Sequence, residues 1–492
     1  MDYKRVELQS VQTYSSVEDG VPIQVHKSQG PSFNGHRNEQ AEPLEAPSDG
    51  VFTQEMHASN DLKEIVNTVD DDGHGIESTP GGMSTFGTIV TFLKCLVGTG
   101  ILYQPYMFSV AGLWYAVMIF TLVAFLSTWN MLLLLQCHTS VAKNLELYPS
   151  SRSGKKSCSS AITMATLGYD ACGRVGLWAV NMSTLLSQLG YCTAYFIYVT
   201  RNLNQLFGNI KDGEEANAMQ WLATPQGLIT AQLAIYIPLA LVRQLKYFHW
   251  PNVIGNCCIW GGLMLVSYYI CTTLATTGVQ PIQEFNPTGA LLYLGSAAVV
   301  FEGIVLVLPL REATAKKEQY PKVLVSVMTG LAIFFLLFSA GGYLAFGANT
   351  QTFVTLNVPE TCWIGVAVKL MYCLAVVFTY PLMLFPAVQV LERLLMPKLP
   401  TGVLQRWAFS SLRVVTVFVT LIVSIAAGQC YDKFMALIGA LCACPLALVY
   451  PPLIYIRIHW SNMSYIAKAR EVLNLSVGMM FLIVCTYTTL MT

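Results

Sequence analysis

The sequence predicts an all-α polytopic membrane protein that crosses the bilayer about eleven times. The chain of 492 residues is 54% hydrophobic and only 11% charged, whereas about a quarter of the residues of a soluble globular domain are charged. Apolar windows close to the length of a bilayer span also recur from residue 86 onward. The expected spans are 86–109, 111–136, 176–200, 226–242, 251–277, 288–310, 323–345, 363–390, 408–427, 434–455 and 472–490.

The first 85 residues differ in composition from the rest of the chain. They hold 15 acidic and 5 basic residues, a net charge of −10, whereas the remaining residues hold 13 acidic and 23 basic, a net charge of +10. A polar stretch without hydrophobic periodicity cannot bury enough apolar surface to offset the entropy of ordering. We therefore predict a disordered acidic cytosolic tail over residues 1–85, available to cytosolic partners, and a transmembrane domain over residues 86–492.

The basic residues between the spans predict the orientation of the chain. The connections 138–175, 243–250, 311–322, 391–413 and 456–470 carry 18 Lys and Arg, and the opposite set of connections carries 3. Connections rich in Lys and Arg stay in the cytosol. The N-terminus is therefore predicted to be cytosolic and the C-terminus to lie on the other side of the membrane.

Glycine interrupts two of the expected spans, and these two spans lie five helices apart. The first span contains Gly98-Thr99-Gly100, and the sixth contains Phe301-Glu302-Gly303. A repeat of five helices, an odd number, would be inverted across the membrane, which predicts a 5+5 inverted repeat with broken helices 1 and 6, plus one extra helix. Paired interruptions of this kind indicate the substrate site of a transporter.

The exposed backbone at such a break suits a zwitterion. A half-helix that starts near Gly98, Thr99, Gly100 and Ile101 offers amide groups and a positive dipole end to a carboxylate. Phe301, Glu302 and Gly303 offer carbonyls, and a carboxylate, to an ammonium group. The alternative is that the glycines only let neighbouring helices approach closely.

A few polar side chains within the spans are further candidates. Glu302 and Lys94 are predicted as coupling residues, since a charge at this depth is costly unless it faces a cavity. Lys369 is interpreted as structural, and Thr379 and Tyr380 as substrate-binding residues. We find no phosphate-binding loop, dinucleotide-binding loop, metal-ligand cluster or nucleophile motif, so we predict neither an enzyme nor a cofactor or metal site.

Several motifs together resemble the amino acid/auxin permease family, most closely its proton-coupled amino acid transporters, and also vacuolar amino acid transporters. The motifs are LKCLVGTGIL from Leu93, SQLGYCTAYFIYV from Ser187, FEGIVLVLPL from Phe301, GYLAFGANTQTFVTLNVP from Gly342 and ALIGALCACPLALVYPPL from Ala436. The resemblance implies the eleven-helix inverted-repeat fold, a carboxylate site at Gly98, Thr99 and Gly100, and an amine site at Phe301, Glu302 and Gly303.

The sequence also departs from this family pattern. A proton-linked His of the family is replaced by Thr91, its Asn by Leu96, and its Leu-Glu pair after the sixth-helix proline by Leu310-Arg311. Cys362 matches one half of a non-cytosolic disulfide whose other half the loop 201–225 lacks, and Cys430 is the other cysteine predicted on that side. The resemblance therefore supports the fold more firmly than the coupling mechanism.

The predicted function is secondary active transport of amino acids by alternating access, with the proton as the expected coupling ion and sodium still open. A passive amino acid uniporter or channel, and an amino-acid-sensing transceptor, are the alternatives. The predicted partners are small-molecule amino acids and the lipid bilayer, not nucleic acid. The predicted location is a vacuolar or lysosomal membrane, or the plasma membrane.

Overall fold

The first expected span consists of two helices in the computed structural model, which describes residues 84–147, 162–207, 224–242, 249–395 and 403–491. Helix α2 (Thr85–Leu96) begins at Ser84, whose side chain accepts a hydrogen bond from the Gly87 amide, and it ends where Val97 becomes extended. Helix α3 (Gly100–Ala111) follows. The predicted tail falls almost entirely on residues 1–83, outside the described residues, as does the side chain of Lys94.

The sixth expected span is broken in the same way. Helix α10 (Pro287–Val300) ends before Phe301, and α11 (Ile304–Ala313) starts after Gly303. Both predicted interruptions are therefore real breaks between two helices, because the glycine-containing segments leave the helical path.

The other described segments are also helical. They are α4 (Leu113–Leu147), α5 (Met164–Phe207), α7 (Pro225–Ala231), α8 (Leu233–Leu241), α9 (His249–Thr277), α12 (Tyr320–Phe346), α13 (Trp363–Leu395), α14 (Val403–Ala427), α15 (Tyr431–Ile438), α16 (Tyr450–His459) and α17 (Tyr465–Met491). Two π-helical segments, η6 (Gly439–Ala443) and η7 (Pro445–Val449), join α15 to α16. Three short 3-10 turns complete the set: η4 (Gly347–Asn349), η5 (Val354–Asn357) and η8 (Trp460–Asn462).

Each of the eleven expected spans coincides with one of these helices or with helices in series, which confirms the all-α polytopic class. Within the described residues, eight stretches are long and apolar enough to cross a membrane by themselves. The remaining three expected spans are not among these eight stretches, each for a physical reason. The first is divided into two 12-residue halves, Pro225–Leu241 is short, and α5 carries Ser, Thr, Gln and Tyr along its middle.

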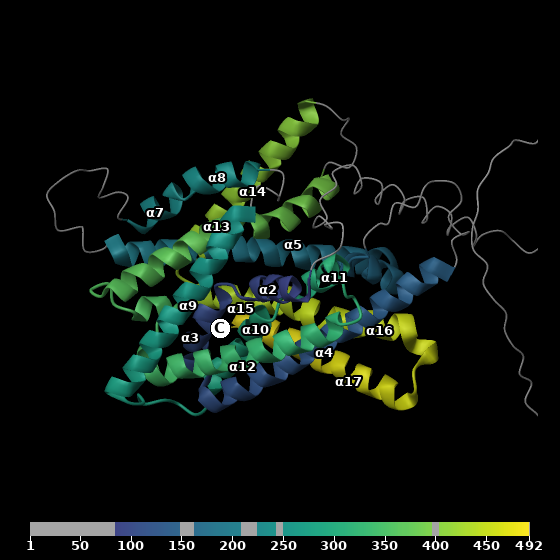
Figure 1. Ribbon diagram of the computed structural model, residues 1–492, viewed down its shortest axis with the longest axis horizontal. Helices are drawn as coiled ribbons and strands as arrows, with labels where there is room; N and C mark the ends of the chain where they lie inside the picture. Colours follow the sequence, from purple (N-terminus) through teal and green to yellow (C-terminus); the bar gives the residue numbers. More distant parts are fainter. Residues whose placement is uncertain (1–83, 148–161, 208–223, 243–248, 396–402, 492) are drawn as a thin grey trace, which may run out of the picture. The chain divides into compact units, whose positions relative to one another are not determined.

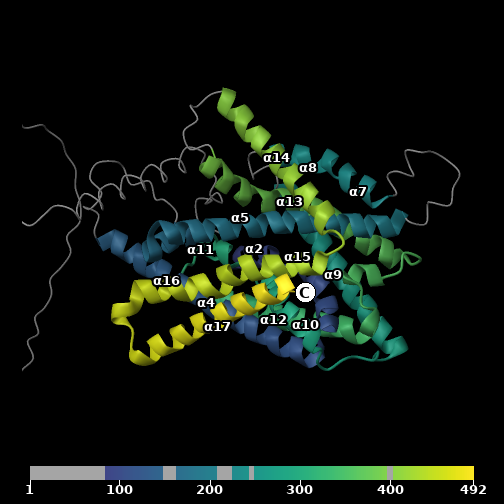
Figure 2. The same ribbon diagram turned by 180° about the vertical axis from the view of Figure 1, so that it is seen from behind.

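The broken helices lie in the middle of the helix bundle, and all described residues belong to one compact unit. Helix α10 packs against α3, α4, α15, η6 and α17, while α13 packs against α5 and α9. Figure 1 shows α2, α3, α10 and α15 between α5 on one side and α4, α12 and α17 on the other, and Figure 2 shows α2 and α15 between α5 and α17 from behind. The packing therefore surrounds both breaks with other helices.

Buried rings hold α3, α4 and α10 together beside the second break. The Phe301 ring packs 4.9 Å from the Phe120 ring, and Phe108 lies edge-on to both Phe120 and Tyr293. Elsewhere the helices approach through glycine: a Cβ atom on Gly439 of η6 would fall 2.1 Å from the carbonyl oxygen of Gly295 on α10. These contacts fix the position of α10 and hence of the break that follows it.

Candidate functional site

The two breaks predicted from the sequence meet in the structure. Leu96 is the last residue of α2, and Gly303 is the residue before α11. A Cβ atom on Gly303 would fall 2.4 Å from Leu96 Cδ2. Any residue larger than glycine at position 303 would therefore require the Leu96 side chain to move.

The first break presents backbone rather than side chains. Helix α3 starts at Gly100, and Thr99, which precedes it, makes no side-chain cap. The first amides of a helix lack intrahelical acceptors and lie at the positive end of the helix dipole. A Cβ atom on Gly98 or on Gly100 would meet no atom within 4 Å, so packed neighbours do not crowd this stretch of backbone.

A small cavity lies beside this first break. Gly98 and Thr99 form one part of its wall, and side chains of α5, α9 and α13 form the rest. The lining residues are Gly98, Thr99, Tyr195, Ile259, Tyr372, Val376 and Thr379. The structure thus brings together three residues expected at a substrate site, Gly98, Thr99 and Thr379, in a lining without a charged side chain.

One buried hydroxyl of the cavity wall lacks a hydrogen-bond partner among the described residues. The Thr379 hydroxyl donates to the carbonyl of Ala375 at 2.8 Å, within its own helix. The Tyr372 hydroxyl is buried and makes no hydrogen bond with the described part of the chain. The Tyr372 ring lies against α9, where a Cβ on Gly262 would come within 2.7 Å of it. A buried hydroxyl without a partner is costly, and a ligand in the cavity would remove that cost.

Glu302, at the second break, faces a different direction. Both carboxylate oxygens are buried. Neither accepts a hydrogen bond from the described residues. Ser187 of α5 and Cys442 of η6 lie close enough to interact with the carboxyl group, although the Ser187 hydroxyl donates to the Thr184 carbonyl at 3.1 Å. Glu302 therefore points between α5 and η6 and is not part of the cavity wall.

The other predicted site residues lie outside this cavity. Tyr380 is fully buried, stacks on Tyr236 with ring centroids 4.0 Å apart, and shares a hydrogen bond with Thr420. Ile101 and Phe301 are buried in the core on either side of the breaks. Two predicted residues thus pack in the core, and Tyr380 joins α8, α13 and α14.

Lys369 is held by structural contacts, as interpreted from the sequence. Its ammonium group donates to the Val358 carbonyl at 2.9 Å and pairs with Glu360 at 3.3 Å. Cys362 and Cys430 are both free, so these two cysteines of the expected non-cytosolic loops are not joined to each other.

The cavity residues that sequence reasoning missed are Tyr372 and three others, Tyr195, Ile259 and Val376. An aromatic or aliphatic residue within an apolar span is ordinary, because most such residues pack against other helices or lipid. Only the packing of α5, α9 and α13 turns these three side chains toward Gly98 and Thr99.

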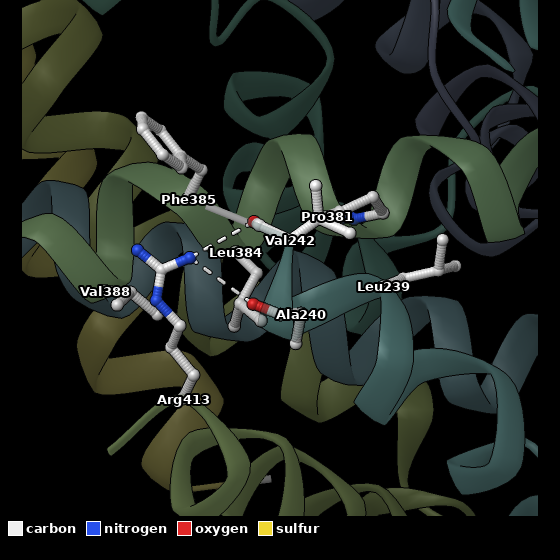
Figure 3. Close-up of a pocket in the computed structure, with 8 residues that line it drawn as sticks. All are labelled: Leu239, Ala240, Val242, Pro381, Leu384, Phe385, Val388 and Arg413. Carbon is white, nitrogen blue, oxygen red and sulfur yellow. Dashed lines mark hydrogen bonds between the residues drawn. The ribbon is translucent and has the colours of Figure 1, made fainter. Parts of the chain in front are cut away.

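A second small cavity lies between α8, α13 and α14 (Figure 3). Its polar group is Arg413, which donates to the carbonyls of Ala240 and Val242 at the end of α8, at 3.4 and 3.3 Å, and to Glu392 at 3.2 Å. A basic side chain that satisfies the last carbonyls of a helix stabilises the helix end. This arrangement explains the buried arginine as a structural cap.

An all-helical membrane protein whose two broken helices meet beside a cavity has the construction of a secondary transporter. Comparison with known proteins specifies the family. Residues 81–492 match the family model described as "Transmembrane amino acid transporter protein", and the chain belongs to this family.

Curated relatives agree with this assignment. Vacuolar amino acid transporter 3 of Schizosaccharomyces pombe is 29% identical, over 84% of this chain and 58% of the relative. Vacuolar amino acid transporter 4 of Saccharomyces cerevisiae is 26% identical, over 78% of this chain and 54% of the relative. Amino acid transporter ANT1 of Arabidopsis thaliana is 24% identical, over 87% of this chain and 99% of the relative. The chain thus spans just over half the length of the two yeast relatives.

Solved structures share the fold. The inward-facing conformation of Mhp1 superposes with a TM-score of 0.50 at 14% identity, over 84% of this chain and 92% of Mhp1. MhsT in complex with L-phenylalanine gives a TM-score of 0.50 at 11% identity, over 82% of this chain and 98% of MhsT. At such low identity the likeness concerns the fold alone.

Proposed function

We propose that this protein is a secondary transporter that moves amino acids across a membrane by alternating access, driven by a proton gradient. The observation that carries the proposal is the meeting of the two helix breaks, Leu96 against Gly303, next to the cavity at Gly98 and Thr99. Broken helix ends at this depth are tolerated where they line a cavity. The names of the relatives, which are amino acid transporters, support the substrate class.

The geometry suggests a role for each part of the site. The substrate carboxylate binds at the start of α3, where amides and the helix dipole favour an anion. The substrate side chain enters the cavity between Tyr195, Ile259 and Val376, and the Tyr372 hydroxyl supplies a hydrogen bond. Since the cavity wall has no charged side chain, a neutral substrate side chain suits it.

Glu302 is the proposed proton carrier. It adjoins the second break, its carboxylate oxygens are buried, and no ion pair is formed with it within the described ranges. An ionised carboxylate without a partner is unfavourable in a membrane interior, so Glu302 holds a proton while it is buried. A movement of the broken helix that exposes Glu302 to water would let it release that proton.

The proposed location is the membrane of a vacuole or a similar acidic compartment. The relatives named as vacuolar transporters support it, and the excess of basic residues in one set of connections supports a cytosolic N-terminus. Export from such a compartment follows the proton gradient toward the cytosol.

The proposal is tested with purified protein in liposomes. An imposed pH gradient should drive accumulation of at least one amino acid above its equilibrium level, and a protonophore should abolish it. In Glu302→Gln, gradient-driven accumulation should be lost while exchange of labelled for unlabelled substrate continues. Full accumulation by Glu302→Gln would remove Glu302 as the proton carrier, and downhill movement alone by the wild type would indicate a uniporter.

A further inference from the structure

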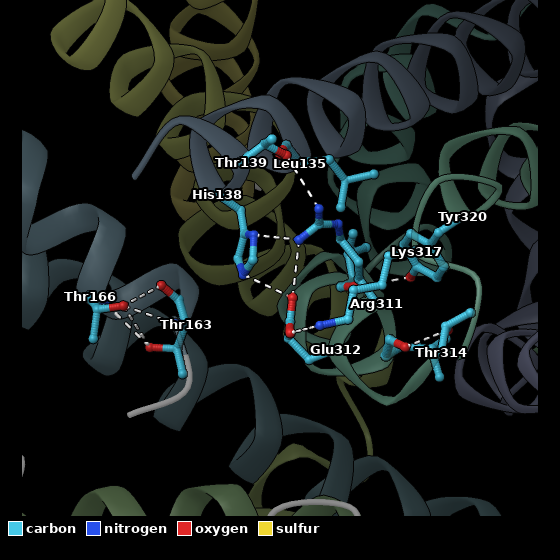
Figure 4. Close-up of polar contacts among 12 residues, drawn as sticks. Leu135, His138, Thr139, Thr163, Thr166, Arg311, Glu312, Thr314, Lys317 and Tyr320 are labelled. Atoms are coloured by element: carbon cyan, nitrogen blue, oxygen red, sulfur yellow. Dashed lines mark hydrogen bonds and ion pairs between the residues drawn. The ribbon is translucent and has the colours of Figure 1, made fainter. Parts of the chain in front are cut away.

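A second polar cluster, outside the proposed substrate site, links α4 to the end of α11. It consists of His138 of α4, Arg311 and Glu312 of α11, and Lys317 of the segment that follows (Figure 4). The His138 side chain is only 3% exposed, whereas Glu312 and Lys317 are 35% and 47% exposed. The cluster therefore has a buried imidazole at one end and reaches solvent at the other.

The contacts define which nitrogen of His138 carries the proton. Arg311 NH1 lies 2.6 Å from His138 Nδ1 and 3.0 Å from Glu312 Oε1. Because a guanidinium group can only donate, Nδ1 must accept this hydrogen bond and carries no proton. His138 Nε2 lies 3.3 Å from Glu312 Oε1, which places the single ring proton on Nε2. This contact geometry thus requires a neutral imidazole.

A proton on Nδ1 would destroy this contact. An Nδ1–H group and an Arg311 N–H group would then face each other at 2.6 Å, two donors that both carry positive charge. Arg311 retains Glu312 and a longer contact to Thr139 at 3.4 Å, but its direct link to the imidazole is lost. The protonated state of His138 is therefore incompatible with the observed approach of α11 to α4.

The groups around His138 are those of α11, the segment after it and α16. Arg311 and Glu312 contact the ring, and the positive charge of Lys317 pairs with Glu312. Ser140, two residues further along α4, bonds to His459 Nε2 of α16 at 2.8 Å. Thr163, just before α5, and Thr166 of α5 also lie on this side of the bundle, bonded to each other (Figure 4). Glu312 is thus the carboxylate partner of the ring in this cluster, and Arg311 is the partner that a proton would oppose.

The position of the cluster connects it to the breaks. Helix α11 is the second half of the broken sixth span, and Thr314 at its end contacts Thr88 of α2, the first half of the other broken span, with their hydroxyl oxygens 3.1 Å apart. Tyr320 at the start of α12 donates to the Val307 carbonyl of α11 at 3.0 Å. A contact that fastens α11 to α4 therefore restrains both half-helices at this end of the bundle.

We propose that His138 Nδ1 is a proton-binding site, and that a proton taken up there from the adjoining solution breaks the Arg311 contact and releases α11 from α4. The proton adds to the Nδ1 lone pair, so the Arg311 N–H loses its acceptor. Glu312 remains the acceptor for both Arg311 and the protonated His138. Release lets α11, and α2 through Thr88 and Thr314, move away, which opens the substrate path at this end. The inference rests on the proposed transport function, and it assigns His138 a positioning role.

Substrate exchange at equal pH on both sides of the liposome tests the proposal, because no gradient and no net proton flow are required. Wild-type exchange should accelerate as pH falls across the range in which imidazoles titrate, by up to about tenfold per pH unit. His138→Gln offers an amide oxygen to Arg311 and an amide N–H to Glu312, so it should keep the contact closed: exchange should be slow and independent of pH. Arg311→Gln removes the guanidinium group that reaches His138 Nδ1, so α11 should be released at every pH and exchange should be fast and equally independent of pH.

The matched control is His459→Gln, which alters a neighbouring histidine outside the cluster and should keep the wild-type pH profile. The same profile in His138→Gln or in Arg311→Gln would overturn the proposal, as would its loss in His459→Gln. If either His138→Gln or Arg311→Gln does not fold, the pH profile of the other variant still tests the proposal.

Hydrogen exchange of the α11 peptides, corrected for the intrinsic effect of pH, supplies a readout that does not depend on transport. Exchange should rise on acidification in the wild type and not in His138→Gln. If the wild type moves no amino acid, the proposed function fails while this measurement still confirms or refutes the proton site.

Discussion

Substitution of Gly98 by valine tests whether the first helix break binds the substrate carboxylate. A Cβ atom on Gly98 would meet no atom within 4 Å, and the backbone there does not require glycine. Gly98→Val should therefore fold. Its two methyl groups would enter the cavity beside Thr99, at the place where the carboxylate is expected.

The magnitude follows from two terms. An anion at a helix start contributes about 0.3–1 kcal/mol, and up to about 2 kcal/mol where it is partly buried. A misfit in a binding pocket costs about 1–3 kcal/mol. Together they predict a loss of at least about 1.3 kcal/mol, which is a roughly tenfold or larger rise in the dissociation constant.

The assay is equilibrium binding of labelled substrate to the purified protein, with the thermal unfolding temperature measured alongside. Gly330→Val is the matched control, since Gly330 is exposed on α12 and a Cβ there also meets no atom within 4 Å. The control should bind normally. Unchanged affinity in a folded Gly98→Val would mean that the carboxylate does not bind at this break.

Two further predictions concern the cavity wall and the helix packing. Tyr372→Phe removes a buried hydroxyl that has no internal partner, so stability should stay the same or rise, while substrate affinity should fall by about 0.5–1.5 kcal/mol, or roughly three- to tenfold; a binding titration of the variant with unchanged affinity would refute the hydrogen bond to the substrate. Gly439→Ala places a Cβ atom 2.1 Å from the Gly295 carbonyl oxygen and should destabilise the protein by about 1–3 kcal/mol; an unfolding temperature equal to that of Gly98→Ala, where the added Cβ meets open space, would contradict the tight packing of η6 on α10.

The sequence by itself determined the class of the protein and the position of its two helix breaks. Apolar spans are recognisable without a partner, because a bilayer demands a minimum length of apolar helix. Glycine at Gly98, Gly100 and Gly303 is recognisable as well, since such residues weaken a helix locally. The family motifs lie on these same stretches, so the fold could be predicted from residues that are close in the chain.

Only the tertiary structure decided which side chains surround the break. Tyr195, Ile259 and Val376 come from three helices, and their apolar character in the sequence is that of any membrane helix. Tyr380 was predicted at the site, yet the rotation of α13 turns it toward Tyr236 and Thr420, while Thr379, one residue earlier, reaches the cavity.

The same holds for the charged residues. Arg311 was visible in the sequence only as a departure from the family pattern, and His138 carried no signal at all. The packing of α11 on α4 brings the two within 2.6 Å. A short contact between residues 173 positions apart in the chain depends on the rotation and spacing of two helices, which local sequence pattern does not specify.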